Sequence, residues 1–256
     1  MCASLWPTRL PPGFSRRVWP SSSLRRKVEF ILYQPESAST CRLPALYLLH
    51  GSGHSPATVL RDVRPQSCLV DLGEALLVIP DGRQGWWLDS PIIDHSRYES
   101  YLLELVRFVE SEYPVAADRE SRGLCGFSMG GFGAMHLAAR HAEHFGSASS
   151  LLGPLDIVQW HPEYYRLARL LGRDLATWRE HNPTECCAHL ANTSLRFSTG
   201  SEAVDRPQND AFARALDRLA IAHEYEIYPG MHDAAWVRAH LAGDFAFHRR
   251  CFSRRA

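Results

Sequence analysis

The feature that most constrains this chain is an alternation of short apolar runs with segments of helix length. The runs are continuously apolar, as in residues 45–49, instead of alternating polar and apolar positions. Strands of that kind are buried on both faces, which is typical of a parallel sheet covered by helices on each side. The predicted strands are residues 28–33, 45–49, 75–79, 123–126, 147–151, 195–198 and 224–228. We therefore expect an α/β fold with a mostly parallel central sheet.

Helical patterns fill several of the intervals between these strands. Residues 98–112 repeat apolar side chains at three- and four-residue spacing, and Pro114 follows them. Further helices are predicted at residues 129–141, 209–222 and 234–249, the last as one helix or a helix pair. Residues 154–190 do not follow the alternation and are expected to form a small, cap-like helical insertion over the carboxyl ends of the strands. Their aromatic residues could equally be the core of a small helical subdomain.

The length of 256 residues suits one domain of the large α/β kind. The first 27 residues contain six basic side chains and no acidic one, but four prolines interrupt any amphipathic helix of a transit peptide. An apolar signal segment is also missing. We expect residues 1–26 to form an irregular arm and residues 27–256 to form the single domain.

The composition argues against several classes of partner. The 28 basic and 28 acidic side chains balance, so no basic face for nucleic acid is expected. No apolar run has the length needed to cross a bilayer, and no membrane partner is expected. The seven cysteines lack paired spacing, which favours free thiols in a reducing, cytoplasmic location. Cys186, Cys187 and His189 have no second ligand cluster, so we expect no metal and no cofactor.

The segment Gly126-Phe127-Ser128-Met129-Gly130 matches the G-x-S-x-G nucleophile elbow of α/β-hydrolases. In that motif the serine stands on a sharp turn between a strand and a helix, where only small neighbours leave room around it. The helix N-terminus then favours negative charge that develops beside the serine oxygen. A predicted strand ends at Gly126 and a predicted helix begins at Met129, which is the required setting. The alternative interpretation is a glycine-rich turn with a buried serine.

A second motif, His50-Gly51-Ser52, follows the predicted strand 45–49. Acyl transfer requires two backbone N–H groups that point at the carbonyl oxygen as it becomes an oxyanion. One comes from the residue after the nucleophile, here Met129, and the other comes from a loop after an early central strand. Ser52 is well placed to supply it.

The catalytic base is expected near the C-terminus, after the acid in chain order. His232 follows the predicted strand 224–228 and therefore lies on a loop at the expected end of the sheet. The other nearby histidines lie inside a predicted helix or before the strand: His240, His248 and His223. The acid should lie in the loop of residues 199–205, and Asp205 is favoured there over Glu202. Asp156, one strand earlier, is the serious rival.

Five segments together resemble the putative esterase family. They are LYLLHG (46–51), PDG (80–82), YESYLLEL (98–105), GFSMGGFGAM (126–135) and GMHDAAW (230–236). That family contains the esterase D or S-formylglutathione hydrolases, the tributyrin-type bacterial esterases, the feruloyl esterases and the mycolyltransferases. The resemblance extends from about Lys27 to His248.

The resemblance implies roles for the same residues that the motifs single out. The family pattern places the nucleophile on Ser128, the acid on Asp205 and the base on His232, with oxyanion donors on the backbones of Ser52 and Met129. S-formylglutathione hydrolases usually have histidine before the serine and a different stretch after the HG pair. This chain has Phe127 and Ser-Gly-His-Ser at those places, which is more similar to small bacterial carboxylesterases.

The expected function is hydrolysis of short-chain acyl esters through an acyl-enzyme, with a small-molecule ester as the substrate. Trp86, Trp87 and His54 are candidates for the substrate pocket, although aromatic residues beside a site are also ordinary packing. The alternatives are an acyltransferase or an S-formylglutathione-type thioesterase on the same triad, and an inactive binding protein that keeps the fold. Assembly of identical copies stays open.

Overall fold

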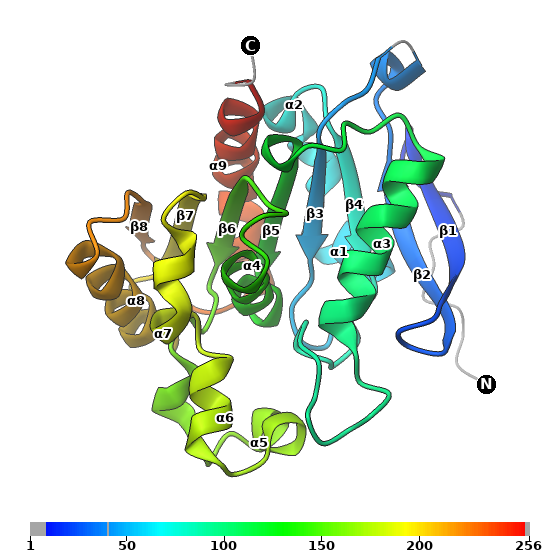
Figure 1. The fold of residues 1–256 in the computed structure, drawn as a ribbon. Helices are drawn as coiled ribbons and strands as arrows, with labels where there is room; N and C mark the ends of the chain where they lie inside the picture. The colour runs from blue at the N-terminus through cyan, green and yellow to red at the C-terminus, as the bar shows by residue number, and fades with distance from the viewer. Residues whose placement is uncertain (1–8, 40, 254–256) are drawn as a thin grey trace.

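Eight strands of the computed structural model, which describes residues 9–39 and 41–253, form one sheet (Figure 1). The strands are β1 (Phe14–Ser21), β2 (Arg26–Tyr33), β3 (Ala45–Leu49), β4 (Leu76–Pro80), β5 (Arg122–Phe127), β6 (Ser147–Leu151), β7 (Ser194–Gly200) and β8 (Glu224–Tyr228). Their order across the sheet is β1-β2-β4-β3-β5-β6-β7-β8. The pairs β1–β2 and β2–β4 are antiparallel, and every pair from β4 to β8 is parallel. All seven predicted strands are present in this mostly parallel sheet.

The N-terminal segment corrects one expectation. Residues 14–21 are not part of an irregular arm but form β1, which pairs antiparallel with β2 along its whole length. Phe14 and Trp19 are buried, whereas the arginines between them point outward. An edge strand with one solvated face can be built from such a polar sequence, and Pro20 is tolerated near its end because an edge needs fewer N–H donors. The first eight residues of the expected arm lie outside the described residues.

Two hydrophobic layers enclose the sheet, one on each face. Along β3, Leu46 and Leu48 pack into one layer, while Tyr47 and Leu49 pack into the other. This alternation is the two-residue period of a strand, and both faces are buried because helices cover each of them. The first layer contains side chains of α1 (Pro56–Asp62), α2 (Leu69–Leu72) and α9 (Ala234–Ser253). The second contains side chains of α3 (Tyr98–Glu112), α4 (Met129–Arg140) and α8 (Arg206–Arg218).

The strand register brings the carboxyl ends of the central strands to one edge of the sheet. Leu49 of β3 pairs with Gly126 of β5, and Leu151 of β6 pairs with both Phe127 and Ser198 of its neighbours. The loops that follow these strands therefore meet. In open α/β sheets this edge is where ligands bind.

The segment expected to form the helical insertion consists of short helices. Its elements are η4 (Ile157–Trp160), α5 (Tyr165–Leu171), α6 (Leu175–Glu180), α7 (Pro183–Cys186) and η5 (Cys187–Leu190). Figure 1 shows α5 and α6 projecting beyond the carboxyl ends of the strands, at the bottom of the view. Three further 3-10 turns lie at η1 (Glu36–Ser39), η2 (Pro65–Ser67) and η3 (Arg119–Ser121). None of the helices in residues 9–39 and 41–253 combines the length and apolar character needed to cross a membrane.

Candidate active site

The turn between β5 and α4 holds Ser128 in a strained backbone conformation. Its φ of 54° and ψ of −121° lie in a region that residues other than glycine rarely adopt. The two motif glycines explain how the turn closes. A Cβ atom on Gly126 would lie 2.0 Å from the carbonyl oxygen of Gly130, and one on Gly130 would lie 1.9 Å from that of Leu49. The spacing of the motif is therefore a steric requirement, and it leaves the Ser128 side chain partly exposed.

Three side chains from separate loops form one hydrogen-bonded chain at this turn. His232 Nε2 lies 2.9 Å from Ser128 Oγ, and His232 Nδ1 lies 2.7 Å from Asp205 Oδ1. The loops follow β5, β7 and β8, so the structure brings together the residues predicted as nucleophile, acid and base. His232 is partly exposed, whereas Asp205 is completely buried. A nucleophile, a base within hydrogen-bonding reach and a carboxylate that orients the base form the arrangement of serine hydrolases.

The carboxylate of Asp205 is held by donors on its second oxygen. Thr199 Oγ1 donates to Oδ2 over 2.7 Å, and Asn209 Nδ2 donates to the same atom over 3.0 Å. Asp205 also occupies the residue position just before α8, and the dipole of that helix favours negative charge there. The rival acid Asp156 lies elsewhere and accepts hydrogen bonds from Asn182 and from Gln159 of the insertion.

The backbone N–H groups of Ser52 and Met129 have no hydrogen-bond acceptor within the described part of the chain. Met129 is the first residue of α4, where helical N–H groups are unpaired. Ser52 follows Gly51, which lies close to the nucleophile, since a Cβ on Gly51 would be 3.1 Å from Ser128 Cβ. Both predicted oxyanion donors thus flank the serine.

A buried imidazole fixes the turn that carries Ser52. His50 Nε2 accepts a hydrogen bond from the Gly82 backbone over 2.9 Å, which joins the HG motif to the PDG motif. The indole of Trp87 donates to the carbonyl oxygen of His50 over 3.2 Å. His50 and Trp87 have no exposed surface. The PDG motif therefore helps to hold the turn whose residue Ser52 is the predicted oxyanion donor.

The three predicted pocket residues occupy different environments. Trp87 is enclosed in the core, so it does not form a pocket wall, contrary to the expectation for this residue. Trp86 is 2% exposed and packs edge-on against Phe132 of α4 and Tyr164 of the insertion. His54 is only partly buried and lies edge-on to Phe127, the neighbour of the nucleophile. Burial lowers the pKa of His54, which favours its neutral form.

Two hollows lie near Ser52 on the side of the insertion, and Gln84, whose side chain contacts Ser52, lines both. The smaller one, of about 200 Å³, is lined by Gln84, Tyr165, Arg166 and Arg169. Ser52 Oγ contacts both Gln84 and Arg166. The larger one, of about 330 Å³, shares Gln84 and Arg169 with it and adds Arg26, Arg83 and His95. Within the part of the chain that the structure describes, no acidic residue lines either hollow.

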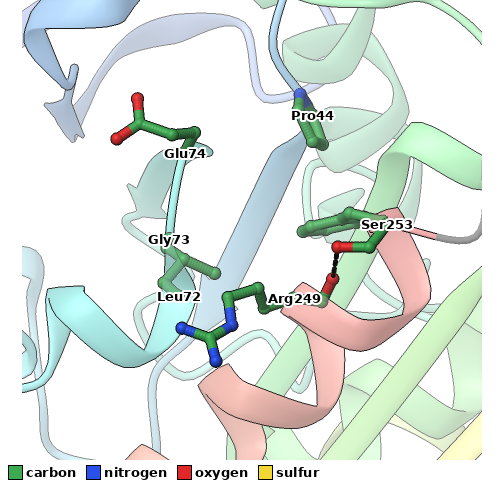
Figure 2. Close-up of a pocket in the computed structure, with 7 residues that line it drawn as sticks. Pro44, Leu72, Gly73, Glu74, Arg249 and Ser253 are labelled. Atoms are coloured by element: carbon green, nitrogen blue, oxygen red, sulfur yellow. Dashed lines mark hydrogen bonds between the residues drawn. The ribbon is translucent and has the colours of Figure 1, made fainter.

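Another hollow is remote from the triad. It has a volume of about 660 Å³ and lies between the α2–β4 connection and the end of α9, with Leu72, Glu74 and Arg249 on its walls (Figure 2). Pro44 on its rim precedes β3, so this hollow is at the amino ends of the strands. The triad lies at the carboxyl ends.

Several residues of the site were not found from the sequence. The sequence prediction places Thr199 in a loop and Asn209 at the start of a helix, and it gives neither residue a role. Arg166 and Gln84 carry no motif that would link them to Ser52. Only the pairing of separate loops reveals these contacts, because the partners are far apart in the chain.

The comparisons with known sequences agree with the geometry. A family model described as "Putative esterase" matches residues 21–248. Esterase Rv1288 of Mycobacterium tuberculosis is 33% identical over 220 residues, which cover 74% of this chain and 48% of that protein. S-formylglutathione hydrolase of Paracoccus denitrificans is 25% identical over 217 residues, which cover 76% of this chain and 74% of that protein. The chain thus spans about half the length of the mycobacterial relative.

Solved structures resemble the fold over nearly the whole chain. FphF, a fluorophosphonate-binding serine hydrolase of Staphylococcus aureus, superposes with a TM-score of 0.83 at 18% identity, covering 92% of this chain and 98% of that one. MPT51 of Mycobacterium tuberculosis superposes with a TM-score of 0.80 at 17% identity, covering 95% of this chain and 100% of that one. At these identities the likeness concerns the fold, and it confirms the α/β-hydrolase architecture expected from the sequence.

Proposed function

The chain belongs to the putative esterase family of α/β-hydrolases, and on that basis we propose that it is a serine carboxylesterase that uses Ser128, His232 and Asp205. The observation that carries the proposal is the unbroken hydrogen-bonded chain from Ser128 Oγ through His232 to Asp205, with distances of 2.9 and 2.7 Å. An inactive binding protein has no need for a strained serine that is aligned with a base.

In the first half-reaction Ser128 Oγ attacks the ester carbonyl carbon while His232 Nε2 takes the hydroxyl proton. The carbonyl oxygen becomes an oxyanion, and the N–H groups of Ser52 and Met129 donate hydrogen bonds to it. The positive end of the α4 dipole adds to this stabilisation. His232 then gives its proton to the alkoxy oxygen, the C–O bond breaks, and the alcohol leaves an acyl group on Ser128.

In the second half-reaction water replaces the alcohol. His232 takes a proton from the water as its oxygen attacks the acyl carbon, and a second oxyanion forms between the same two N–H groups. The bond to Ser128 breaks, and His232 returns the proton to the serine oxygen. Asp205 keeps the imidazole in the tautomer with the proton on Nδ1 and stabilises the imidazolium during each transfer.

The substrates we propose are esters of short acyl chains, from acetyl to about hexanoyl. The hollows beside Ser52 are small, and their walls carry arginine and glutamine side chains. A long fatty chain needs an extended apolar channel, because each buried methylene contributes only about 0.8 kcal/mol when it fits such a surface. Hollows of about 200 and 330 Å³ have room for a short acyl chain but do not form an extended channel.

The test is kcat/KM for p-nitrophenyl esters from acetyl to palmitoyl, together with labelling by a fluorophosphonate. We expect stoichiometric labelling at Ser128 and a specificity that falls beyond about hexanoyl. A preference for palmitoyl over butyryl would exclude the short-chain proposal but leave the esterase intact. Absence of both labelling and turnover would favour a binding protein. Supplying a competing alcohol and measuring product partition distinguishes hydrolysis from acyl transfer.

A second candidate function is hydrolysis of an S-acyl glutathione. The observation that favours it is the arginine lining near Ser52, since neither Arg166 nor Arg169 pairs with a carboxylate among the described residues and Arg166 donates to hydroxyl oxygens instead. Glutathione carries carboxylates that could pair with these side chains. S-formylglutathione and p-nitrophenyl acetate should be compared in the wild type and in Arg169→Met. A thioesterase role predicts a higher kcat/KM for the thioester and a loss confined to it in the variant.

A further inference from the structure

A buried cluster of two imidazoles and a carboxylate lies at α4, about two helical turns along the chain from Ser128. Glu99 comes from the first turn of α3, His136 from the middle of α4, and His181 from the connection between α6 and α7. Their exposed fractions are 6%, 1% and 7%. One oxygen or nitrogen atom from each residue lies within 4.8 Å of the other two. The proposed hydrolysis uses none of these side chains.

We propose that Glu99, His136 and His181 bind a divalent transition-metal ion, of which Zn²⁺ is the expected occupant. The set of two imidazole nitrogens and one carboxylate oxygen is a known three-ligand combination for zinc. Calcium and magnesium prefer sites built from oxygen ligands, which this cluster does not offer. The sequence did not indicate the site, because the ligands are distant in the chain and follow no ligand spacing.

The carboxylate is already oriented for this role. Glu99 Oε1 accepts hydrogen bonds from Arg140 Nε over 2.9 Å and from His141 Nε2 over 2.8 Å. The other oxygen, Oε2, faces His136 Nε2 at 3.3 Å. Oε1 is therefore held by Arg140 and His141, which are not proposed ligands, while Oε2 points to the proposed ligand His136. Outer contacts of this kind commonly fix the ligands of protein metal sites.

Both imidazoles are held in place, and one lacks a partner. The ring of His136 stacks on Phe132 with an angle of 9° between their planes. The ring of His181 lies 5.2 Å from that of His136. His181 Nδ1 is buried and has no hydrogen-bond partner in the described residues. Leaving a buried polar atom unsatisfied costs free energy, which a ligand bound by this ring would offset.

The types of side chain suit a metal ion, because neutral imidazole nitrogens and an ionised carboxylate are the forms that coordinate metals. The neighbouring Arg140 is 40% exposed, so water screens its charge.

Metal binding there would join three parts of the fold. The ion would tie α3 and α4 to the helical insertion, through a residue between α6 and α7. An ion that binds only the folded chain stabilises it, by about 2.7 kcal/mol at one hundred times its dissociation constant. In a chain of this size that corresponds to a rise in Tm of about 5–10 °C.

The experiment uses Co²⁺ as a spectroscopic probe on the full chain, after treatment with a chelator. We expect one equivalent of Co²⁺ to produce visible d–d absorption that one equivalent of Zn²⁺ removes, with a rise in Tm for each metal. His181→Ala should weaken binding at least about 100-fold, since loss of an outer partner alone can cost that much. The metal-free Tm of His181→Ala should fall only by the cost of the cavity that the ring leaves, because Nδ1 has no hydrogen bond to lose.

Two control variants separate this site from other histidines. His144→Ala removes a ring near the end of α4 that pairs with Glu143, outside the cluster, and should bind Co²⁺ like the wild type. His232→Ala removes the triad imidazole and should also retain the absorption. The proposal is overturned if the wild type binds no Co²⁺, if His181→Ala binds it with unchanged affinity, or if His232→Ala abolishes the signal. His136→Gln provides a second ligand variant should His181→Ala fold poorly.

Discussion

Asn209 Nδ2 donates a hydrogen bond over 3.0 Å to Asp205 Oδ2, the carboxylate oxygen that faces away from His232. An amide nitrogen is only a donor, so the atom it contacts must be an acceptor. In Asp205→Asn the new side chain would therefore place its oxygen toward Asn209 and its NH₂ group toward His232 Nδ1. That NH₂ group can only donate, which forces the imidazole proton onto Nε2.

We predict that Asp205→Asn lowers kcat by about 10⁴-fold, because the wrong tautomer of His232 cannot accept the Ser128 proton. The measurement is steady-state hydrolysis of p-nitrophenyl acetate, with circular dichroism to verify folding. Asp156→Asn is the matched control and should change kcat little, since Asp156 contacts Asn182 and Gln159. If Asp156→Asn lost activity while Asp205→Asn kept it, the acid would be misassigned.

Replacement of the nucleophile tests the chemical step directly. Ser128→Ala should lower ester hydrolysis by several powers of ten, as removal of a triad nucleophile does in serine hydrolases. The protein should remain folded, and labelling by a fluorophosphonate should disappear. Alanine also has a Cβ, so the backbone strain at φ 54° is unchanged. More than a tenth of wild-type turnover in this variant would contradict the role of Ser128.

A buried histidine far from the site predicts how stability depends on pH. His248 is completely buried between the hydroxyls of Ser147 and Ser149, and burial lowers its pKa from 6.5 to about 3. Between these values the unfolded chain binds a proton that the folded chain does not. Lowering the pH in this window therefore destabilises the fold, by up to about 1.4 kcal/mol per pH unit. Asp244 opposes the trend between pH 3.8 and about 6, because burial raises its pKa to about 6.

The variant His248→Gln isolates this contribution. Glutamine can still hydrogen-bond to the two serines but does not titrate. We expect the variant to be less stable than the wild type at pH 7 and to lose stability more slowly on acidification, with a slope shallower by up to about 1.4 kcal/mol per pH unit below pH 6. Urea unfolding at several pH values measures this. If the free energy of unfolding had the same pH dependence in the two proteins, His248 would make no contribution to it.

The sequence predicted those parts of the fold whose burial pattern repeats locally. Central strands such as β3 are apolar at every position, and the elbow glycines leave a steric signature around Ser128. The sequence prediction missed the edge strand β1 because its exposed arginines and Pro20 are residue types that are typical of loops. Asp205 could be selected by its position after β7, but Thr199 and Asn209 could not. Their roles depend on where two loops meet, which no local pattern encodes.

The last prediction separates packing from substrate contact at Trp87. Its ring fills the space between two glycines, since a Cβ on Gly82 would lie 2.4 Å from it and one on Gly133 would lie 2.6 Å away. Trp87→Ala should lower the free energy of unfolding by about 3–5 kcal/mol, the usual cost of emptying a large aromatic site in a core. The indole also donates to the carbonyl oxygen of His50, so its loss should loosen the turn that carries Ser52 and lower kcat.

The acyl-length optimum should not move, because the ring has no exposed surface with which to meet a substrate. The measurements are urea unfolding and kcat/KM over the p-nitrophenyl series, recorded at a temperature where the variant is folded. Trp87→Phe is the conservative control and should recover part of the stability without restoring the hydrogen bond to His50. A shift of the optimum toward longer esters in Trp87→Ala would mean that this ring borders the acyl pocket after all.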